Sequence, residues 1–86
     1  MNEIVTIENK VILLTGAFGL IGLTLAKSFV MQGAKVVLAD SNKKLAIKAE
    51  AELRAQGLLK NTLICITNIT KEKSCNDCIG SAIKKF

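Results

Sequence analysis

At 86 residues the sequence is long enough for one small domain and no more. Its hydrophobic content of 50% excludes a disordered chain, and three Phe are its only aromatic residues. The net charge of +5 comes from basic residues scattered along the chain. A nucleic-acid surface instead clusters its positive charge and adds aromatic residues for stacking. We therefore expect no nucleic-acid partner.

The N-terminal segment has neither the basic stretch nor the apolar core of a signal peptide. Residues 11–31 are apolar over a length that could span a bilayer. The glycines within this segment and the charge of Lys27 favour a strand, a turn and a helix instead. We expect a cytoplasmic protein with no membrane segment. Three Cys without a secretion signal agree with a reducing compartment.

The first predicted strand is Val11–Thr15, and the first predicted helix runs from Leu20 to about Gln32, with Gly33 as its C-cap. Apolar residues recur in this helix every four positions, at Ile21, Leu25 and Phe29. The second strand follows at once, over residues 34–40.

The second helix is predicted over about 43–56, with N-cap candidates in the segment 41–43 and Gly57 after its end. Its apolar positions are Leu45, Ala49 and Leu53. The third strand is expected at about 62–67. The third helix is expected to start near Thr70, as N-cap, and to run to the C-terminus, with apolar positions Cys75, Cys78, Ile79, Ala82, Ile83 and Phe86.

The element order is therefore β-α-β-α-β-α, and the strands are apolar runs without alternation, which is typical of a parallel sheet covered on both faces. Right-handed crossovers place the strands in the order 3-2-1, with the first two helices on one face and the third on the other. The chain is then a single, incomplete α/β domain, residues 1–86, that stops before a fourth strand. The free apolar edge at residues 11–14 is a candidate surface for self-association.

Three glycines at three-residue intervals, Gly16, Gly19 and Gly22, connect the first strand to the first helix. A strand that turns through glycines into a helix directs unpaired backbone N–H groups and a positive helix end at one point, where phosphate binds. Asp40 ends the next strand about 20 positions further on, where a dinucleotide site has its acidic residue. The alternative is that the glycines only serve turns and close packing, and that Asp40 lies near a helix N-cap.

Three segments resemble the short-chain dehydrogenases/reductases, over about 10–86: Asn9–Ala17, Gly33–Asp40 and Asn68-Ile69-Thr70. This resemblance implies a partial doubly wound Rossmann fold that binds a dinucleotide. Asp40 would then contact the adenosine ribose, and Asn68 and Ile69 would line the adenine. The pyrophosphate would lie at the glycine loop, whose candidate residues are Thr15, Gly16, Phe18, Gly19, Leu20, Ile21 and Gly22.

Two features depart from the usual pattern of this family. The glycine spacing matches the extended branch, whose members often act on nucleotide sugars, whereas the downstream residues look classical. Asn68 replaces the adenine-contacting Asp, and its amide can still meet the adenine amino group. Thr15 is either a packing residue or a hydroxyl that ties down the glycine turn.

The cofactor expected from the charges is NAD rather than NADP. A carboxylate at Asp40 repels the 2′-phosphate of NADP and suits the free hydroxyls of NAD. The glycine loop contains no Arg or Lys. Lys43 and Lys44 would favour NADP only if Asp40 turned away.

The family transfers a hydride with a Tyr-x-x-x-Lys pair, but this chain contains no Tyr, and no His to replace it. One hypothesis is the NAD-binding half of such an oxidoreductase, whose intact form acts on a small-molecule alcohol or carbonyl, a sugar derivative among the candidates. The other is a non-catalytic nucleotide-binding or partner-pairing module of natural short length. No catalytic residue is assigned in either case.

Cys75 and Cys78 have the spacing of a redox motif, but both fall among the apolar positions of the third helix, which favours core packing. Cys65 lies in the third strand and is expected in the core. Three Cys and no His are too few ligands for a structural zinc site. Asp77 is expected on a solvated helix face.

Overall fold

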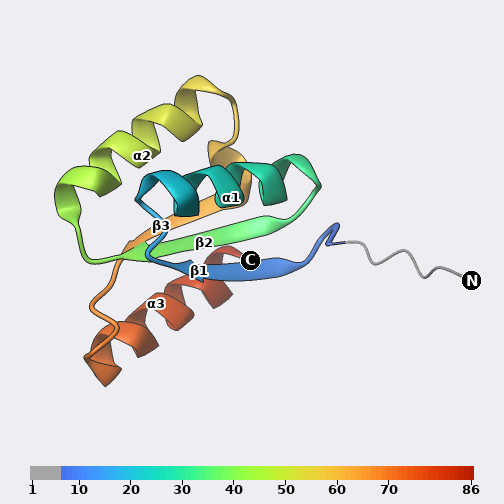
Figure 1. The fold of residues 1–86 in the computed structure, drawn as a ribbon. Coiled ribbons are helices and arrows are strands. Elements are labelled where there is room, and N and C mark those ends of the chain that lie inside the picture. Colours follow the sequence, from blue (N-terminus) through green and yellow to red (C-terminus); the bar gives the residue numbers. More distant parts are fainter. Residues whose placement is uncertain (1–6) are drawn as a thin grey trace, which may run out of the picture.

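The computed structural model describes residues 7–86, which form three strands and three α-helices in the predicted alternating order (Figure 1). A short 3-10 helix at Leu59–Asn61 was not predicted. The elements are β1 (Val11–Thr15), α1 (Leu20–Met31), β2 (Lys35–Asp40), α2 (Lys43–Ala55), β3 (Thr62–Ile66) and α3 (Glu72–Lys85).

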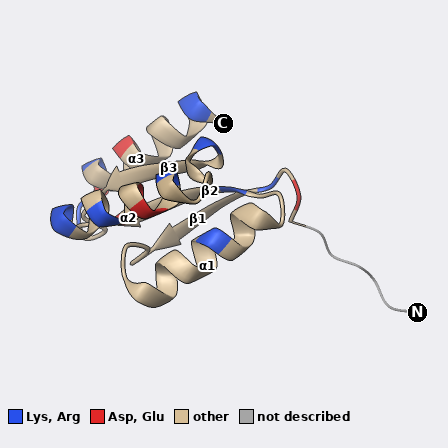
Figure 2. Ribbon diagram, turned by 90° about the horizontal axis from the view of Figure 1, so that it is seen from above, with Lys and Arg blue, Asp and Glu red and all other residues tan. Residues whose placement is uncertain are grey.

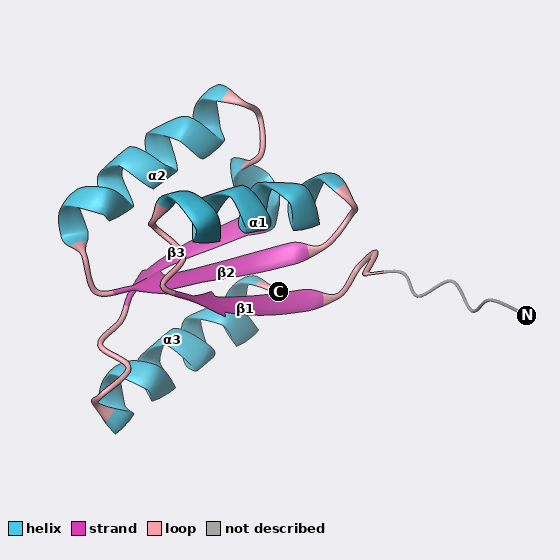
Figure 3. Ribbon diagram, in the orientation of Figure 1, coloured by secondary structure: helices cyan, strands magenta, loops and turns pink. Residues whose placement is uncertain are grey.

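The three strands form one parallel sheet in the order β1-β2-β3, which confirms the predicted topology. In the register, Leu38 of β2 lies opposite Leu14 of β1 and Ile64 of β3. Helices α1 and α2 cover one face of the sheet and α3 lies against the other (Figures 1 and 3). The central strand β2 is therefore covered on both faces, and residues 36–39 of it are almost fully buried.

Two hydrophobic clusters hold the layers together. On the α1 and α2 face the fully buried Val36 and Leu38 belong to a cluster with Leu53 of α2. On the α3 face a smaller cluster joins Val37 and Ala39 to Cys78. Burial of a side chain such as Leu38 or Leu53 is worth about 1.5–3 kcal/mol. An ion pair of 2.8 Å between Lys27 of α1 and Glu52 of α2 adds a polar contact between the two helices.

The first helix forms as predicted, but of its three predicted apolar positions only Phe29 packs against the core, where it is half-buried. Ile21 and Leu25 are 78% and 45% exposed. The buried residues of α1 are Leu23, Ala26 and Val30. Gly22 lies against the glycine loop, and Ala26 and Val30, four and eight positions after it, lie on the same face of the helix.

Two helix caps differ by one residue from the prediction. α1 ends at Met31 with Gln32, not Gly33, as its C-cap. The N-cap of α3 is Lys71 rather than Thr70. Thr70 instead donates hydrogen bonds to the side chain of Asn68, so it belongs to the turn that precedes the helix. The N-cap of α2 is Asn42, within the predicted segment.

The edge of the sheet at β1 is open, as expected. Val11 and Leu13 are half-exposed there, and together with Ile79, Ile83 and other residues they line a groove of about 420 Å³.

Lys and Arg are distributed over all three helices rather than concentrated on one face (Figure 2). Within residues 7–86 no helix has both the length and the apolar character needed to cross a membrane.

Replacing Leu53 by Ala tests the larger cluster. Leu53 is fully buried, so the cavity left by L53A should lower the free energy of unfolding by about 2–5 kcal/mol. Ile47 lies on the same helix and is 73% exposed, so I47A is the matched control and should change it by less than about 0.5 kcal/mol. Urea denaturation followed by circular dichroism measures both, and equal effects would contradict the assigned core.

Candidate functional site

The glycine loop lies between the end of β1 and the start of α1, at the carboxyl ends of the parallel strands. Its path is fixed by the sheet, because Ala17 N donates a 3.3 Å hydrogen bond to Ala39 O of β2. In open α/β sheets ligands bind outside this edge. The loop therefore occupies the position that a ligand site requires.

Close contact between α1 and the loop depends on Gly22. A Cβ atom at this position would lie 2.6 Å from Gly16 O and 2.7 Å from the Cα of Ala17, both backbone atoms. Gly16 itself has φ +61°, a left-handed conformation that glycine adopts at little cost. The first and third glycines therefore allow the helix to begin directly against the strand.

The start of α1 carries no polar cap. Its N-cap is Gly19, and no acidic side chain lies in its first turn. The bond from Leu23 N to Gly19 O, 2.9 Å, is the first of the helix, so the N–H groups of residues 20–22 have no partner within it. By contrast, Asn42 caps α2 by accepting a 3.0 Å hydrogen bond from Leu45 N.

The space directly beside Gly16 and Gly19 is open. A Cβ built at Gly16 or Gly19 meets nothing within 4 Å. Unpaired N–H groups, a positive helix dipole and open space are the elements of a phosphate-binding site. Leu20 and Ile21 place exposed side chains at the same end of α1.

Asp40 connects the loop to the second helix. Its Oδ2 accepts a hydrogen bond from Phe18 N and its Oδ1 accepts one from Asn42 N, each at 3.3 Å. These two bonds leave lone pairs of the half-buried carboxylate able to accept from a ligand hydroxyl. The side chain of Phe18 is buried in the core, so only its backbone faces the site.

The turn after β3 lies at the same edge of the sheet, because Thr67 N donates a 2.8 Å hydrogen bond to Asp40 O. Asn68 Oδ1 accepts bonds from Thr70 N (3.0 Å) and Thr70 Oγ1 (2.6 Å), while Ile69 is 63% exposed. Thr15 is exposed at the end of β1, which argues against its role in packing. The fold thus brings the glycine loop, Asp40 and Asn68 to neighbouring strand ends.

Sequence reasoning missed Ser74. Its Oγ accepts a 2.9 Å hydrogen bond from Asn68 N and ties the turn to the first turn of α3. A serine near the start of a helix is a known signal for capping, but here it caps a residue of the preceding turn, which only the folded chain reveals.

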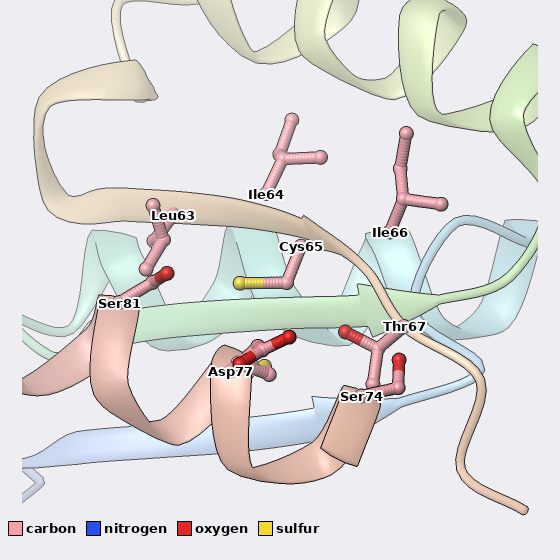
Figure 4. Close-up of a pocket in the computed structure, with 9 residues that line it drawn as sticks. Leu63, Ile64, Cys65, Ile66, Thr67, Ser74, Asp77 and Ser81 are labelled. Atoms are coloured by element: carbon pink, nitrogen blue, oxygen red, sulfur yellow. The ribbon is translucent and has the colours of Figure 1, made fainter. Parts of the chain in front are cut away.

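A second hollow, of about 300 Å³, lies between β3 and α3 (Figure 4). The side chain of Cys65 points into it from β3. Burial and a hydrogen bond with Cys78 raise the pKa of Cys65 to about 12. A reactive thiol needs the opposite shift, because the thiolate is the nucleophile.

The other two cysteines differ in their surroundings. Cys78 is buried, which agrees with core packing, and Cys75 is half-buried with its Sγ 3.6 Å from Ile69 O. Asp77 is exposed and pairs with Lys73 at 3.7 Å. Over the described range 7–86, no three Cys, His, Asp or Glu side chains are grouped so that they could hold a metal ion.

Comparison with known proteins gives matches over most of this chain. The family model for short chain dehydrogenases matches residues 10–86. A 2,5-dichloro-2,5-cyclohexadiene-1,4-diol dehydrogenase of Sphingobium indicum is 36% identical over 80 residues, which cover 93% of this chain and 31% of that enzyme. A 7alpha-hydroxysteroid dehydrogenase of Bacteroides fragilis is 35% identical over 79 residues, 92% of this chain and 30% of that enzyme.

Solved structures match the fold as well. A 3-ketoacyl-(acyl-carrier-protein) reductase from Brucella melitensis complexed with NADH is similar with a TM-score of 0.81 at 33% identity, over 94% of this chain and 31% of that one. A short chain dehydrogenase/reductase from Burkholderia phymatum in complex with NAD has a TM-score of 0.85 at 24% identity, over 96% and 29% of the two chains. The chain therefore spans about 30% of the length of the relatives it matches.

Replacing Gly22 by Ala tests the contact between helix and loop. The added methyl group would collide with backbone atoms that cannot move independently, so G22A should lower the free energy of unfolding by about 1–3 kcal/mol. Gly80 is the control, because it lies in α3 with nothing within 4 Å of an added Cβ. G80A should raise stability by about 0.5–1 kcal/mol. Urea denaturation measures both, and a neutral G22A would refute the close approach.

The raised pKa of Cys65 predicts a loss of stability at alkaline pH. In the unfolded chain the thiol ionises near its ordinary pKa of 9.0, whereas in the folded chain it stays protonated up to about 12. The unfolded state therefore binds fewer protons above pH 9, so this contribution is present below pH 9 and is lost as pH rises toward 12. Urea denaturation under reducing conditions at pH 8 and pH 10.5 should show a larger decrease for the wild type than for C65S. C75S, which keeps Cys65, should behave like the wild type, and equal slopes for C65S and wild type would contradict the assignment.

Proposed function

Because the chain belongs to the short-chain dehydrogenase family, whose members bind NAD or NADP, we propose that it binds NAD across the ends of β1, β2 and β3. The observation that carries this proposal is the uncapped N-terminus of α1, which follows a glycine loop that is hydrogen-bonded to Asp40 through Phe18 N. The family membership gives the class of cofactor. The carboxylate of Asp40 supports the proposal of NAD rather than NADP, and the proposed binding residues are supported by their places at the strand ends.

The pyrophosphate lies against the glycine loop in this proposal. Backbone N–H groups of residues 19–22 donate to its oxygens, and the positive end of the α1 dipole offsets its negative charge. The lack of a Cβ at Gly19 lets the phosphate approach the backbone closely. Thr15, Leu20 and Ile21 border this position with exposed side chains.

The adenosine ribose lies beside Asp40. The hydrogen bonds from Phe18 N and Asn42 N keep the carboxylate directed between the glycine loop and α2. A carboxylate held there accepts from the 2′- and 3′-hydroxyls of NAD and repels the 2′-phosphate of NADP. Lys43 and Lys44 begin α2. They would favour NADP only if Asp40 turned away, and its two hydrogen bonds oppose such a rotation. The adenine lies over Ile69 and Asn68, at the end of β3.

Hydride transfer between NAD and an alcohol or carbonyl substrate is the reaction that we propose for the protein in which these residues act. NAD supplies the hydride chemistry when bound, and the residues of this chain bind and orient it. The chain contains no Tyr, so the acid–base pair that the family uses is not among these 86 residues. A sugar derivative stays a candidate substrate because of the glycine spacing. We also propose that the protein acts in the cytoplasm.

The open edge of β1 favours a second candidate function. Val11 and Leu13 leave an apolar strand edge that could pair with another copy of the chain. The chain would then be a nucleotide-binding module without catalysis. An isolated chain that forms a stable dimer in analytical ultracentrifugation and binds NAD without turnover would favour this function over the first.

Replacing Asp40 by Arg tests the cofactor site. The change removes the ribose acceptor and adds a partner for the 2′-phosphate, so D40R should weaken NAD binding about tenfold and strengthen NADP binding. Isothermal titration calorimetry of the chain with each dinucleotide measures both. D77R makes the same change of charge on the exposed face of α3 and should leave both affinities within about twofold. NAD binding that is the same in D40R and D77R would refute the placement of Asp40 at the ribose.

A further inference from the structure

The carboxamide of Asn68 has a fixed orientation. Its Oδ1 accepts from both Thr70 N at 3.0 Å and Thr70 Oγ1 at 2.6 Å. A backbone N–H can only donate, so the atom that faces it must be the amide oxygen and not the amide nitrogen. The two bonds occupy both lone pairs of this oxygen.

The turn that carries Asn68 is itself held against α3. Asn68 N donates to Ser74 Oγ at 2.9 Å, and Lys71 N donates to Asn68 O at 3.0 Å. Figure 4 shows Ser74 in the first turn of α3, next to Thr67 at the end of β3. Cys75 adds a weak sulfur contact to Ile69 O. Rotation of the amide would break the bonds to Thr70 inside a turn that is fixed at both ends.

The amide nitrogen of Asn68 is the polar atom that remains available. The residue is exposed, and no hydrogen bond of Nδ2 to any residue in 7–86 is present. We propose that Asn68 meets the purine base of the dinucleotide through its Nδ2–H donors, so that the site recognises an acceptor on the purine and not the exocyclic amino group. This inference rests on the proposed binding of NAD. It differs from the expectation that the amide meets the adenine amino group.

The consequence is a broad choice of purine. Adenine has ring nitrogens that accept a hydrogen bond, and hypoxanthine has N7 together with a carbonyl oxygen at the position of the amino group. Both bases can therefore satisfy an N–H donor. A site that used Oδ1 as acceptor would instead lose its partner with hypoxanthine and would face a second acceptor there.

The direct test compares NAD with nicotinamide hypoxanthine dinucleotide on the wild-type chain by isothermal titration calorimetry. We expect the two dissociation constants to agree within about threefold, since an N–H donor finds an acceptor on either base. NAD binding with a loss of about tenfold or more for the hypoxanthine dinucleotide would overturn this inference and leave the proposed function intact. Failure of both to bind would overturn the proposed function together with it.

The variant N68D converts the free donor into an acceptor. One carboxylate oxygen can keep the bonds to Thr70, and the other then faces the base. N68D should therefore prefer NAD over the hypoxanthine dinucleotide by about tenfold, where the wild type has no preference. N76D is the matched control, because it makes the same substitution on the exposed surface of α3, and it should bind both as the wild type does. A preference that is unchanged in N68D would contradict the position of Asn68 at the base.

Discussion

The structure depends on the close approach of α1 to the glycine loop at Gly22. Because a Cβ there would meet backbone atoms of Gly16 and Ala17 at 2.6–2.7 Å, the helix can begin at this distance only with glycine. Gly22 shares its face of α1 with Ala26 and Val30, which enter the core together with Leu23. The close approach also leaves the first N–H groups of α1 exposed next to the strand ends. The packing of α1 and the proposed phosphate site thus depend on the same short distance.

Asp40 extends this arrangement across the sheet. Its backbone accepts from Thr67 N, and its carboxylate accepts from Phe18 N and Asn42 N. One residue at the end of the central strand therefore contacts the loop that follows each of the three strands. A parallel sheet makes this possible, because all of its strands end at the same edge. The proposed ligand site therefore depends on that edge as a whole rather than on any one motif.

Much of this could be predicted from the sequence. The uninterrupted apolar strands indicate a sheet covered on both faces, and glycine spacing followed by an acidic strand end indicates a dinucleotide site. The order and topology of the elements were correct for the same reason: each strand and helix has a strong local pattern. The errors concern a helix in which two faces both carry apolar residues at helical spacing. Ile21 and Leu25 fit the helical period as well as the buried residues do, and periodicity alone does not say which face meets the sheet.

The residue types and their order determined the fold, the glycine loop and the acidic end of the central strand, because these depend on local preference and spacing. The tertiary structure decided which atoms of those residues are available to a ligand. Thr70 was expected to cap α3, and in the folded chain it occupies the oxygen of Asn68 instead. The side chain of Phe18 is taken up by the core, which leaves its N–H to Asp40. Hydrogen-bond partners such as Ser74 come together only after β3 and α3 have packed, so the polarity that Asn68 presents could not be found by reading along the chain.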